Sequence, residues 1–257
     1  MPDLTALRTA LPSALIALDF DGSLSPLELH PENARPLPGV VELLRELRAT
    51  GATVAVVTGR NVTSLLRISG FADIPGLIVY GTHGAERWEA GELRVPEVPP
   101  GLDELRQYLP GLLAGLTQEP ELWLEDKDLS LVIHARLTPD PDAVLEKLAA
   151  PVREAATAAG LGVRPGKEVL EICIPGIDKG TALRELLAPG PSAALYAGDD
   201  LGDLPAFAEV RAWAQRTSRP SLTIGVGPPD GPITGATDIT VRDPRHLIAL
   251  LRQLIGS

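Results

Sequence analysis

The residues best suited to chemistry follow an apolar run near the start of the chain. Residues 15–18 are Leu-Ile-Ala-Leu, and Asp19 and Asp21 come next, with Gly22 and Ser23 directly behind them. A short apolar run predicts a buried strand of a parallel sheet, which would place both carboxylates at its carboxyl end. A pair of carboxylates there suits phosphoryl transfer, because one can attack phosphorus while the other passes protons to and from oxygen.

The two residues after this pair have the properties of a phosphate-binding turn. Gly22 allows a close approach of the backbone, and its amide, with the amide and hydroxyl of Ser23, can hold phosphate oxygens. Because two carboxylates would repel a phosphate dianion, we expect a divalent cation, and oxygen ligands favour Mg²⁺. The alternative is a strand that leads into a polar turn without chemistry. It is weaker because polar groups recur at later strand ends.

The elements that must position these groups alternate between helix and strand. Helices are predicted for residues 38–50, with Gly51 as the stop, and from the cap Asn61 to residue 69; strands are predicted for residues 53–57 and 77–80. This alternation predicts an α/β fold with a doubly wound, Rossmann-like parallel sheet whose loops meet at one edge. Thr58 and Gly59 directly follow the second strand and fall at that edge.

The pattern changes after a proline-rich stretch, residues 95–101, that could act as a hinge. Helices are predicted for residues 102–116 and 140–159, and strands for residues 122–127 and 130–136, with two more strands in 162–174 around Pro165 and Gly166. Adjacent strands of this kind predict a smaller α/β domain with an antiparallel sheet. We therefore expect a core domain of residues 1–100 and 176–257 and an inserted cap domain of residues 101–175.

The first pattern resumes with a helix predicted to start at Lys179 and a strand over residues 193–197. An acidic segment with Asp199, Asp200 and Asp203 follows that strand. Taken alone, such a segment is more often a helix cap or a solvated loop, and Lys179 alone is more often a solvated lysine. The predicted metal site, however, needs oxygens from a neighbouring strand, and Asp199 and Asp203 can supply them. Strands near 222–226 and 239–241 and a helix over 243–255 complete the core.

Four segments resemble, in chain order, the four signatures of the haloacid dehalogenase superfamily of phosphotransferases. They contain Asp19 and Asp21, Thr58, Lys179, and the acidic segment of residues 199–203. The resemblance implies that Asp19 is the nucleophile and that Asp21 is the general acid and base. It implies that Thr58 and Lys179 hold the phosphoryl group, and that Gly22, Ser23 and Gly59 add phosphate contacts. The implied Mg²⁺ ligands are Asp19, Asp21, Asp199 and Asp203. The insert lies between Thr58 and Lys179, a position typical of the sugar-phosphate phosphatases of this superfamily and not of its mutases.

Within the superfamily, the chain resembles the trehalose 6-phosphate phosphatases. The resemblance is carried by residues 18–27, 58–60, 81–84, 124–127, 166–171 and 178–180. Two departures are Ser23, where Thr is usual, and Gly202-Asp203-Leu204, where Thr-Asp-Glu is common. The resemblance implies that five cap residues bind the disaccharide: Glu125, Lys127, Arg136, Lys167 and Glu171. Mixed carboxylates and cations suit sugar hydroxyls, which both donate and accept hydrogen bonds; the alternative is cross-strand ion pairs on a solvated face.

The expected function is Mg²⁺-dependent hydrolysis of trehalose 6-phosphate to trehalose and phosphate through an aspartyl-phosphate, in trehalose biosynthesis. One rival is a phosphatase of the same architecture that acts on sucrose phosphate, a mannosyl phosphoglycerate or a hexose phosphate. Another is a catalytically silent regulator that binds phosphosugars. A silent protein should have lost an acid or a metal ligand, whereas all the key groups are present here.

The composition limits which classes of partner are compatible with this chain. The 257 residues carry 23 basic and 34 acidic side chains, a net charge of -11, which repels polyanions and argues against nucleic acid as a partner. The single cysteine, Cys173, excludes an intramolecular disulfide and a cysteine-rich metal cluster. The first residues lack the build of a secretory signal, and no apolar run reaches the roughly 18 to 20 residues of a membrane span. We expect a cytoplasmic protein, with a monomer favoured, whose partner is a small sugar phosphate.

Overall fold

The computed structural model describes residues 4–166 and 168–256. It divides into two compact units, Met1–Val95 with Asp178–Ser257, and Pro96–Ile177. Each unit has its own sheet and its own apolar core. Among the helices of the described residues, none is long and apolar enough to pass through a bilayer.

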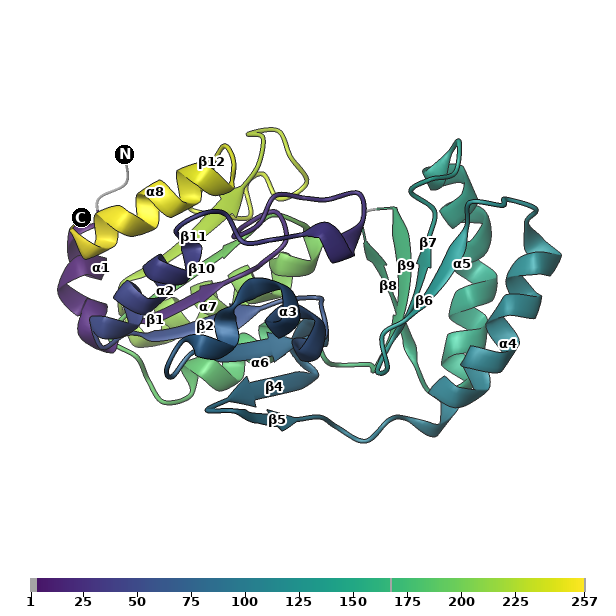
Figure 1. The fold of residues 1–257 in the computed structure, drawn as a ribbon, viewed down its shortest axis with the longest axis horizontal. Coiled ribbons are helices and arrows are strands. Elements are labelled where there is room, and N and C mark those ends of the chain that lie inside the picture. The colour runs from purple at the N-terminus through teal and green to yellow at the C-terminus, as the bar shows by residue number, and fades with distance from the viewer. Residues whose placement is uncertain (1–3, 167, 257) are drawn as a thin grey trace. The chain divides into compact units, whose positions relative to one another are not determined.

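The first unit is built on an eight-stranded sheet (Figure 1). Its order is β12-β11-β10-β1-β2-β3-β4-β5, parallel from β12 to β3, with β4 and β5 added as antiparallel strands. The strands are β1 Leu15–Leu18, β2 Thr53–Val57, β3 Ile78–Gly81, β4 Glu86–Glu89, β5 Glu92–Arg94, β10 Ala194–Gly198, β11 Ser221–Val226 and β12 Ile239–Val241. The predicted α/β fold with a doubly wound parallel sheet is confirmed.

Helices cover both faces of this sheet because its central strands are apolar on both sides. Ile16 and Leu18 face one layer of helices, and Leu15 and Ala17 face the other; all four are fully buried. The first layer is α1 Thr5–Ala10, α2 Val40–Ala49, α3 Val62–Ser69 and α8 Pro244–Ile255, and the second is α6 Lys179–Leu187 and α7 Leu204–Thr217. Burial on two faces explains why these strands read as continuous apolar runs.

Local side-chain chemistry sets the boundaries of the helices that lead into the site. The Asn61 side chain accepts a hydrogen bond from the Ser64 amide (2.7 Å), which confirms the predicted cap of α3. Asp178 and Thr181 form a reciprocal capping box at the start of α6. The helix therefore starts at Lys179 with its first turn anchored.

The order of the strands reverses between β1 and β10. From β1 the chain proceeds to β2 and β3 on one side, whereas β10, β11 and β12 lie on the other. The loops after β1 and β10 therefore diverge, and this switch point is where open α/β sheets bind ligands. Asp19 and Asp199 follow these two strands directly.

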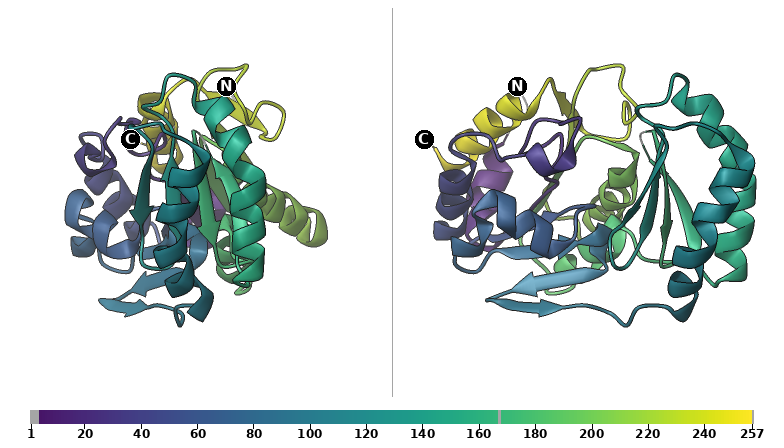
Figure 2. Two further views of the ribbon diagram at one scale, coloured as in Figure 1. Left: turned by 90° about the vertical axis from the view of Figure 1, so that its right-hand side faces the viewer. Right: turned by 45° about the vertical axis from the view of Figure 1, so that its right-hand side comes forward.

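The second unit is a four-stranded antiparallel sheet in the order β6-β7-β9-β8. Its elements are α4 Pro100–Leu116, β6 Trp123–Asp126, β7 Leu131–His134, α5 Pro141–Ala158, β8 Gly162–Gly166 and β9 Val169–Cys173. Both helices pack on one face, against inward residues such as Ile133 and Ile172 (Figure 2). The side chains that alternate with these residues form the opposite face.

The structure corrects one prediction and adds elements that were not predicted. The two strands predicted in residues 162–174 are present, but they do not divide at Pro165 and Gly166, because both residues lie in β8 and pair with Leu170 and Val169. Since β8 is an edge strand, a proline without an amide hydrogen is tolerated there. The helices α1 and α7 and the hairpin of β4 and β5 were not predicted. Within residues 4–166 and 168–256, five short 3-10 helices are η1 Leu11–Ser13, η2 Pro31–Asn33, η3 Phe71–Asp73, η4 Thr82–Gly84 and η5 Leu201–Asp203.

Candidate active site

A buried lysine joins the ends of two central strands. The Lys179 Nζ donates to Asp19 Oδ1 (2.7 Å) and to Asp203 Oδ1 (2.6 Å). All three side chains are almost completely buried. The structure therefore brings together Asp19, Lys179 and Asp203, which the sequence predicted to share one site although Asp19 and Lys179 are 160 positions apart.

Asp203 organises this group. Its Oδ1 accepts from Lys179 Nζ and from the Tyr196 hydroxyl (2.6 Å), and its Oδ2 accepts from the amides of Asp199 (2.9 Å) and Asp200 (3.1 Å). A carboxylate offers about four lone-pair sites, and these four donors use them. Gly198 is required beside it, since a Cβ at that position would lie 2.2 Å from Asp203 Cγ. Asp203 is thus held as a fixed support for the acidic loop and for Lys179.

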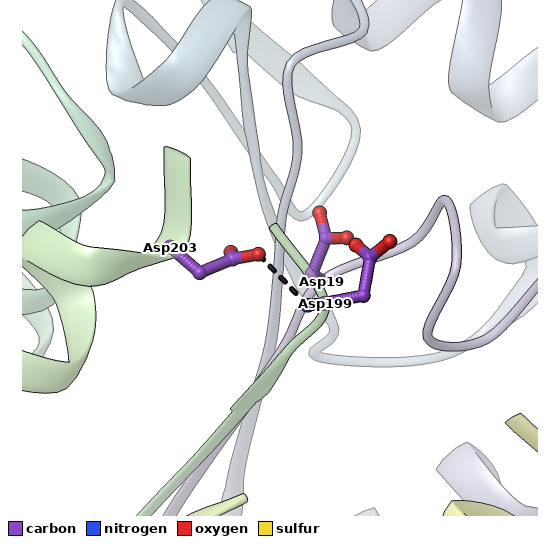
Figure 3. A group of neighbouring side chains, drawn as sticks. All are labelled: Asp19, Asp199 and Asp203. Carbon is purple, nitrogen blue, oxygen red and sulfur yellow. Dashed lines mark hydrogen bonds between the residues drawn. The ribbon is translucent and has the colours of Figure 1, made fainter. Parts of the chain in front are cut away.

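Asp19 and Asp199 lie next to each other at the carboxyl ends of the central strands β1 and β10 (Figure 3). Asp19, Asp199 and Asp203 each offer a carboxylate oxygen, and these oxygens lie within 4.8 Å of one another. Gly22 closes one side of the group, because its φ is +75° and a Cβ there would lie 2.1 Å from Asp199 Oδ2. Only glycine permits this approach. The backbone of Gly22 thus approaches Asp199 closely, and the phosphate contact predicted for Gly22 stays a prediction.

When all three are ionised, the carboxylates of Asp19, Asp199 and Asp203 carry more negative charge than Lys179 can balance. Burial raises the pKa of Asp19 well above its ordinary value, although Lys179 opposes this shift. Burial and the neighbouring carboxylates Asp19 and Asp203 raise the pKa of Asp199. Burial alone would also raise the pKa of Asp203, but Lys179 and Tyr196 hold it below the ordinary value. The ionised forms of Asp19 and Asp199 are therefore disfavoured without a further positive charge, and a divalent cation bound by these two adjacent carboxylates would supply it.

Lys179 stays charged despite its burial. Burial by itself would lower the pKa of Lys179, but Asp19 and Asp203 hold it well above the ordinary value. A buried ammonium with two carboxylate partners is a fixed positive charge. It can attract one phosphate oxygen and orient the Asp19 carboxylate at the same time.

Thr58 lies at the end of β2, in a turn that the backbone pins down. Its amide donates to the Tyr80 carbonyl (2.9 Å), and its hydroxyl accepts from the Arg60 amide (3.2 Å). Gly59 lies under the His83 ring, since a Cβ at Gly59 would lie 2.8 Å from His83 Nε2. Ser23 is fully buried; its amide donates to the Phe20 carbonyl (3.3 Å), and among the described residues its hydroxyl has no partner. The phosphate contacts of these residues stay predictions.

The structure places Asp21 apart from the other predicted metal ligands. Its carboxylate pairs with Arg60, with 2.7 Å from Nε to Oδ2 and 2.7 Å from Nη2 to Oδ1. It does not belong to the group of three carboxylates found among the described residues. Arg60 has no role that the sequence predicts, because spacing alone cannot show which acid an arginine will contact.

Two further residues that support the site were missed. Tyr196 lies inside the buried strand β10, and a buried tyrosine needs a partner for its hydroxyl, which was a usable signal in the sequence. Glu86 is also buried; its Oε2 accepts from the Val62 amide (2.6 Å) and from the Thr82 hydroxyl (3.3 Å). Glu86 therefore ties together the loops after β2 and β3. No local pattern around residue 86 marks this role.

The second unit gathers charged groups on the face that its helices leave open. Glu125 Oε2 lies 2.8 Å from His134 Nε2, and Ser130 Oγ donates to Glu171 Oε1 (2.8 Å). Arg164 lies opposite Glu171 on the neighbouring strand, with its Nη1 3.4 Å from Glu171 Oε2.

The five predicted sugar-binding residues differ in where the structure places them. Glu125 and Glu171 are on this open face, in register with Val132 of β7. Lys127 follows β6. Burial tends to raise the pKa of Glu125, but the hydrogen bond with His134 and, to a smaller extent, the charge of Lys127 hold this pKa below its ordinary value. Arg136 follows β7, and Lys167 lies outside the described residues.

Comparisons with known sequences place residues 17–226 in one family model, described as trehalose-phosphatase. A trehalose-phosphate phosphatase of Mycobacterium leprae (strain TN) is 32% identical over 230 residues, which is 81% of this chain and 49% of that protein. A probable trehalose-phosphate phosphatase of Sinorhizobium fredii (strain NBRC 101917 / NGR234) is 31% identical over 233 residues, 88% of this chain and 82% of that protein. The chain thus spans about half the length of the mycobacterial relative.

Solved structures share the fold. The C-terminal domain of Candida albicans trehalose-6-phosphate phosphatase has a TM-score of 0.82 at 20% identity, with 99% of this chain and 97% of that one covered. A trehalose-6-phosphate phosphatase related protein has a TM-score of 0.73 at 24% identity, with 94% and 97% covered. At these identities the likeness concerns the fold alone.

Proposed function

The chain belongs to the trehalose-phosphatase family, and from this premise we propose that it hydrolyses trehalose 6-phosphate to trehalose and phosphate, as a step of trehalose biosynthesis. The observation that carries the proposal is the buried contact of Lys179 with Asp19 at the end of β1, beside the carboxylate of Asp199. That arrangement offers a nucleophile, a fixed positive charge for phosphate and acidic oxygens for a cation. A cytoplasmic location stays a prediction of the sequence.

The proposed reaction has two steps, each carried by residues of the first unit. Asp21 enters the first step protonated. A carboxylate oxygen of Asp19 attacks phosphorus and the bond from phosphorus to the sugar oxygen breaks, while Asp21 donates its proton to that oxygen. Asp21 then takes a proton from water, whose oxygen attacks the phosphorus of the aspartyl-phosphate; phosphate leaves and Asp19 is restored. Lys179 and Thr58 hold the phosphoryl oxygens throughout. The substrate is left without phosphate and both acids return to their starting states.

We propose Mg²⁺ as the cofactor and Asp19 and Asp199 as the carboxylates that hold it. The two carboxylates are adjacent and their ionised forms lack full compensation, whereas the oxygens of Asp203 already accept four hydrogen bonds. Asp203 therefore supports this group from behind, and Asp21 would have to leave Arg60 before its carboxylate could join. When bound, the ion neutralises charge between the carboxylates and the phosphate.

Divalent cations should stabilise the fold through Asp199. With Mg²⁺ at about 100 times its dissociation constant, the free energy of unfolding should rise by about 2.7 kcal/mol. Asp199→Asn removes one of two repelling carboxylates, so the metal-free variant should be at least as stable as the wild type but gain less than a third of that increase. Thermal unfolding with and without Mg²⁺ measures both. An equal gain in the variant would remove Asp199 from the metal site.

The second unit is proposed to recognise the sugar. The sheet face opposite its helices carries Glu125, which is partly exposed, and Glu171, which is buried; each is already oriented by a neighbour, and carboxylates with fixed positions suit sugar hydroxyls. Other predicted contacts are Lys127, Arg136 and Lys167. We propose that residues 96–177 act as the specificity domain.

Glu171→Gln should separate recognition from chemistry. We expect kcat/KM for trehalose 6-phosphate to fall by about 10- to 100-fold, because a buried hydrogen bond to a charged group contributes about 1.5–3 kcal/mol. The rate on 4-nitrophenyl phosphate should change less than about 3-fold, since that ester has no sugar to recognise. Glu154→Gln makes the same change at an exposed site on α5 and should alter the rate on neither ester. Equal losses on both esters would contradict the specificity role.

A phosphate-release assay over a panel of sugar phosphates tests the proposed function directly. The panel contains trehalose 6-phosphate, sucrose phosphate, a mannosyl phosphoglycerate and glucose 6-phosphate. We expect the highest kcat/KM for trehalose 6-phosphate. A preference for another ester would support the phosphatase activity but contradict the proposed substrate. Binding of a sugar phosphate without phosphate release would favour the catalytically silent regulator.

A further inference from the structure

Arg60 and Asp21 form a well-defined ion pair whose arginine has no part in the proposed reaction. Both guanidinium contacts are 2.7 Å long and engage different carboxylate oxygens, which is the fork geometry of an arginine and a carboxylate. Side-chain exposure is 10% for Arg60 and 32% for Asp21, so the arginine is the buried partner and the carboxylate faces outward. The pair links the loop after β1 to the loop after β2.

Arg60 is itself held from several sides. Its Nη1 donates to the Pro31 carbonyl (2.7 Å), and its guanidinium lies 5.6 Å from the centre of the Phe20 ring. Phe20 is fully buried and packs edge-on against Phe71. A guanidinium with a hydrogen bond, a cation–π contact and a carboxylate fork has little rotational freedom left. The carboxylate of Asp21 therefore takes its direction from a rigid support.

The backbone of Arg60 is equally constrained and lies beside Thr58. The Arg60 amide donates to the Thr58 hydroxyl (3.2 Å), and the Arg60 carbonyl accepts from the Thr82 amide (2.7 Å). One residue thus fixes both the turn that presents Thr58 and the side chain of Asp21. Each oxygen of the carboxylate still has a lone pair that the fork does not use.

We propose that Arg60 is a positioning residue for proton transfer: it aims the carboxyl group of Asp21, protonated on a lone pair that the fork does not use, at the oxygen that leaves phosphorus. This inference rests on the proposed phosphatase function. A displaced general acid matters most where the leaving oxygen is strongly basic, as in a sugar alkoxide, and least where it is stable as an anion, as in 4-nitrophenolate. A purely structural role would instead lower the rates on both esters together.

The test compares two esters in Arg60→Gln and Arg60→Lys. With Arg60→Gln, we expect kcat for trehalose 6-phosphate to fall about 100-fold and kcat for 4-nitrophenyl phosphate to fall less than about 3-fold. Arg60→Lys keeps the charge but loses the fork, so its loss on the sugar ester should be intermediate. Arg67→Gln, the same change at an exposed position of α3, should alter neither rate. Arg60→Lys also serves if Arg60→Gln does not fold, as judged by its thermal unfolding.

A double-mutant cycle with Asp21→Asn tests whether Arg60 acts through Asp21. If Arg60 acts through Asp21, Arg60→Gln should lower the remaining rate on the sugar ester by less than about 3-fold in the Asp21→Asn background. Equal losses on both esters in the single variants, or a full second loss in the double variant, would overturn the proposal and leave the phosphatase function standing. A wild-type protein that hydrolyses neither ester would overturn the phosphatase function, and this proposal with it.

Discussion

Asp19→Asn should abolish the release of phosphate from trehalose 6-phosphate, with kcat at least about 10⁴-fold below that of the wild type. An amide oxygen cannot take the place of a carboxylate as the attacking group, so no covalent intermediate forms. The amide oxygen can still accept the hydrogen bond from Lys179, which keeps Asp203 as its charged partner. We therefore expect a folded variant that has lost its chemistry.

The measurement combines phosphate release with thermal unfolding. Asp73→Asn is the matched control, because it makes the same change at an exposed position of η3 and should leave kcat unaltered. Rapid quenching with labelled substrate should detect phosphate bound to the wild-type protein and none bound to Asp19→Asn. An Asp19→Asn rate within tenfold of wild type, in a sample free of wild-type protein, would refute the assignment of the nucleophile.

Much of the first unit could be predicted because its central strands are buried on both faces. β2 has the predicted bounds Thr53–Val57, and β1 ends at Leu18, directly before Asp19, as predicted. Continuous apolar runs are the signal of such strands, and local caps such as Asn61 mark where helices start. Since the carboxyl ends of parallel strands share one edge, the neighbourhood of Asp19 and Asp199 followed from the sequence.

The elements that were missed differ in how visible they were. α7 carries apolar residues at helical spacing, with Phe207, Val210 and Trp213 buried, so its signal was present in the sequence. The hairpin of β4 and β5 was less visible, since β5 has three residues and all are exposed. A short strand that buries nothing has no apolar pattern to find.

Charge pairing is the part of the site that sequence reasoning could not supply. Asp21 was predicted among the metal ligands, yet its partner in the structure is Arg60, 39 positions away. Which cation meets which acid depends on side-chain direction at the strand ends, and residue types do not encode this direction. For the same reason the hydrogen bonds of Asp203 with Lys179, Tyr196 and two amides could not be predicted, and its place among the metal ligands stays a prediction.

Asp203→Asn should damage both stability and catalysis. All four groups that contact this carboxylate act as donors, so an amide must turn its own NH₂ group toward two of them. Loss of one of the two buried carboxylate partners of Lys179 should lower the free energy of unfolding by about 3–5 kcal/mol. We also expect kcat to fall about 10²- to 10³-fold, because Lys179 and the acidic loop lose their support at the reacting phosphate.

Tyr196→Phe is the matched control for this effect, since it removes one of the four hydrogen bonds and keeps the charge of Asp203. The ring still packs edge-on against Phe207, at 5.3 Å between centres, so the core should stay filled. We expect a loss of about 0.5–1.5 kcal/mol in the free energy of unfolding and a change in kcat of only a few-fold. Denaturant unfolding and steady-state rates measure both variants. If Asp203→Asn cost no more than Tyr196→Phe in stability and in kcat, Asp203 would not be the support that fixes Lys179.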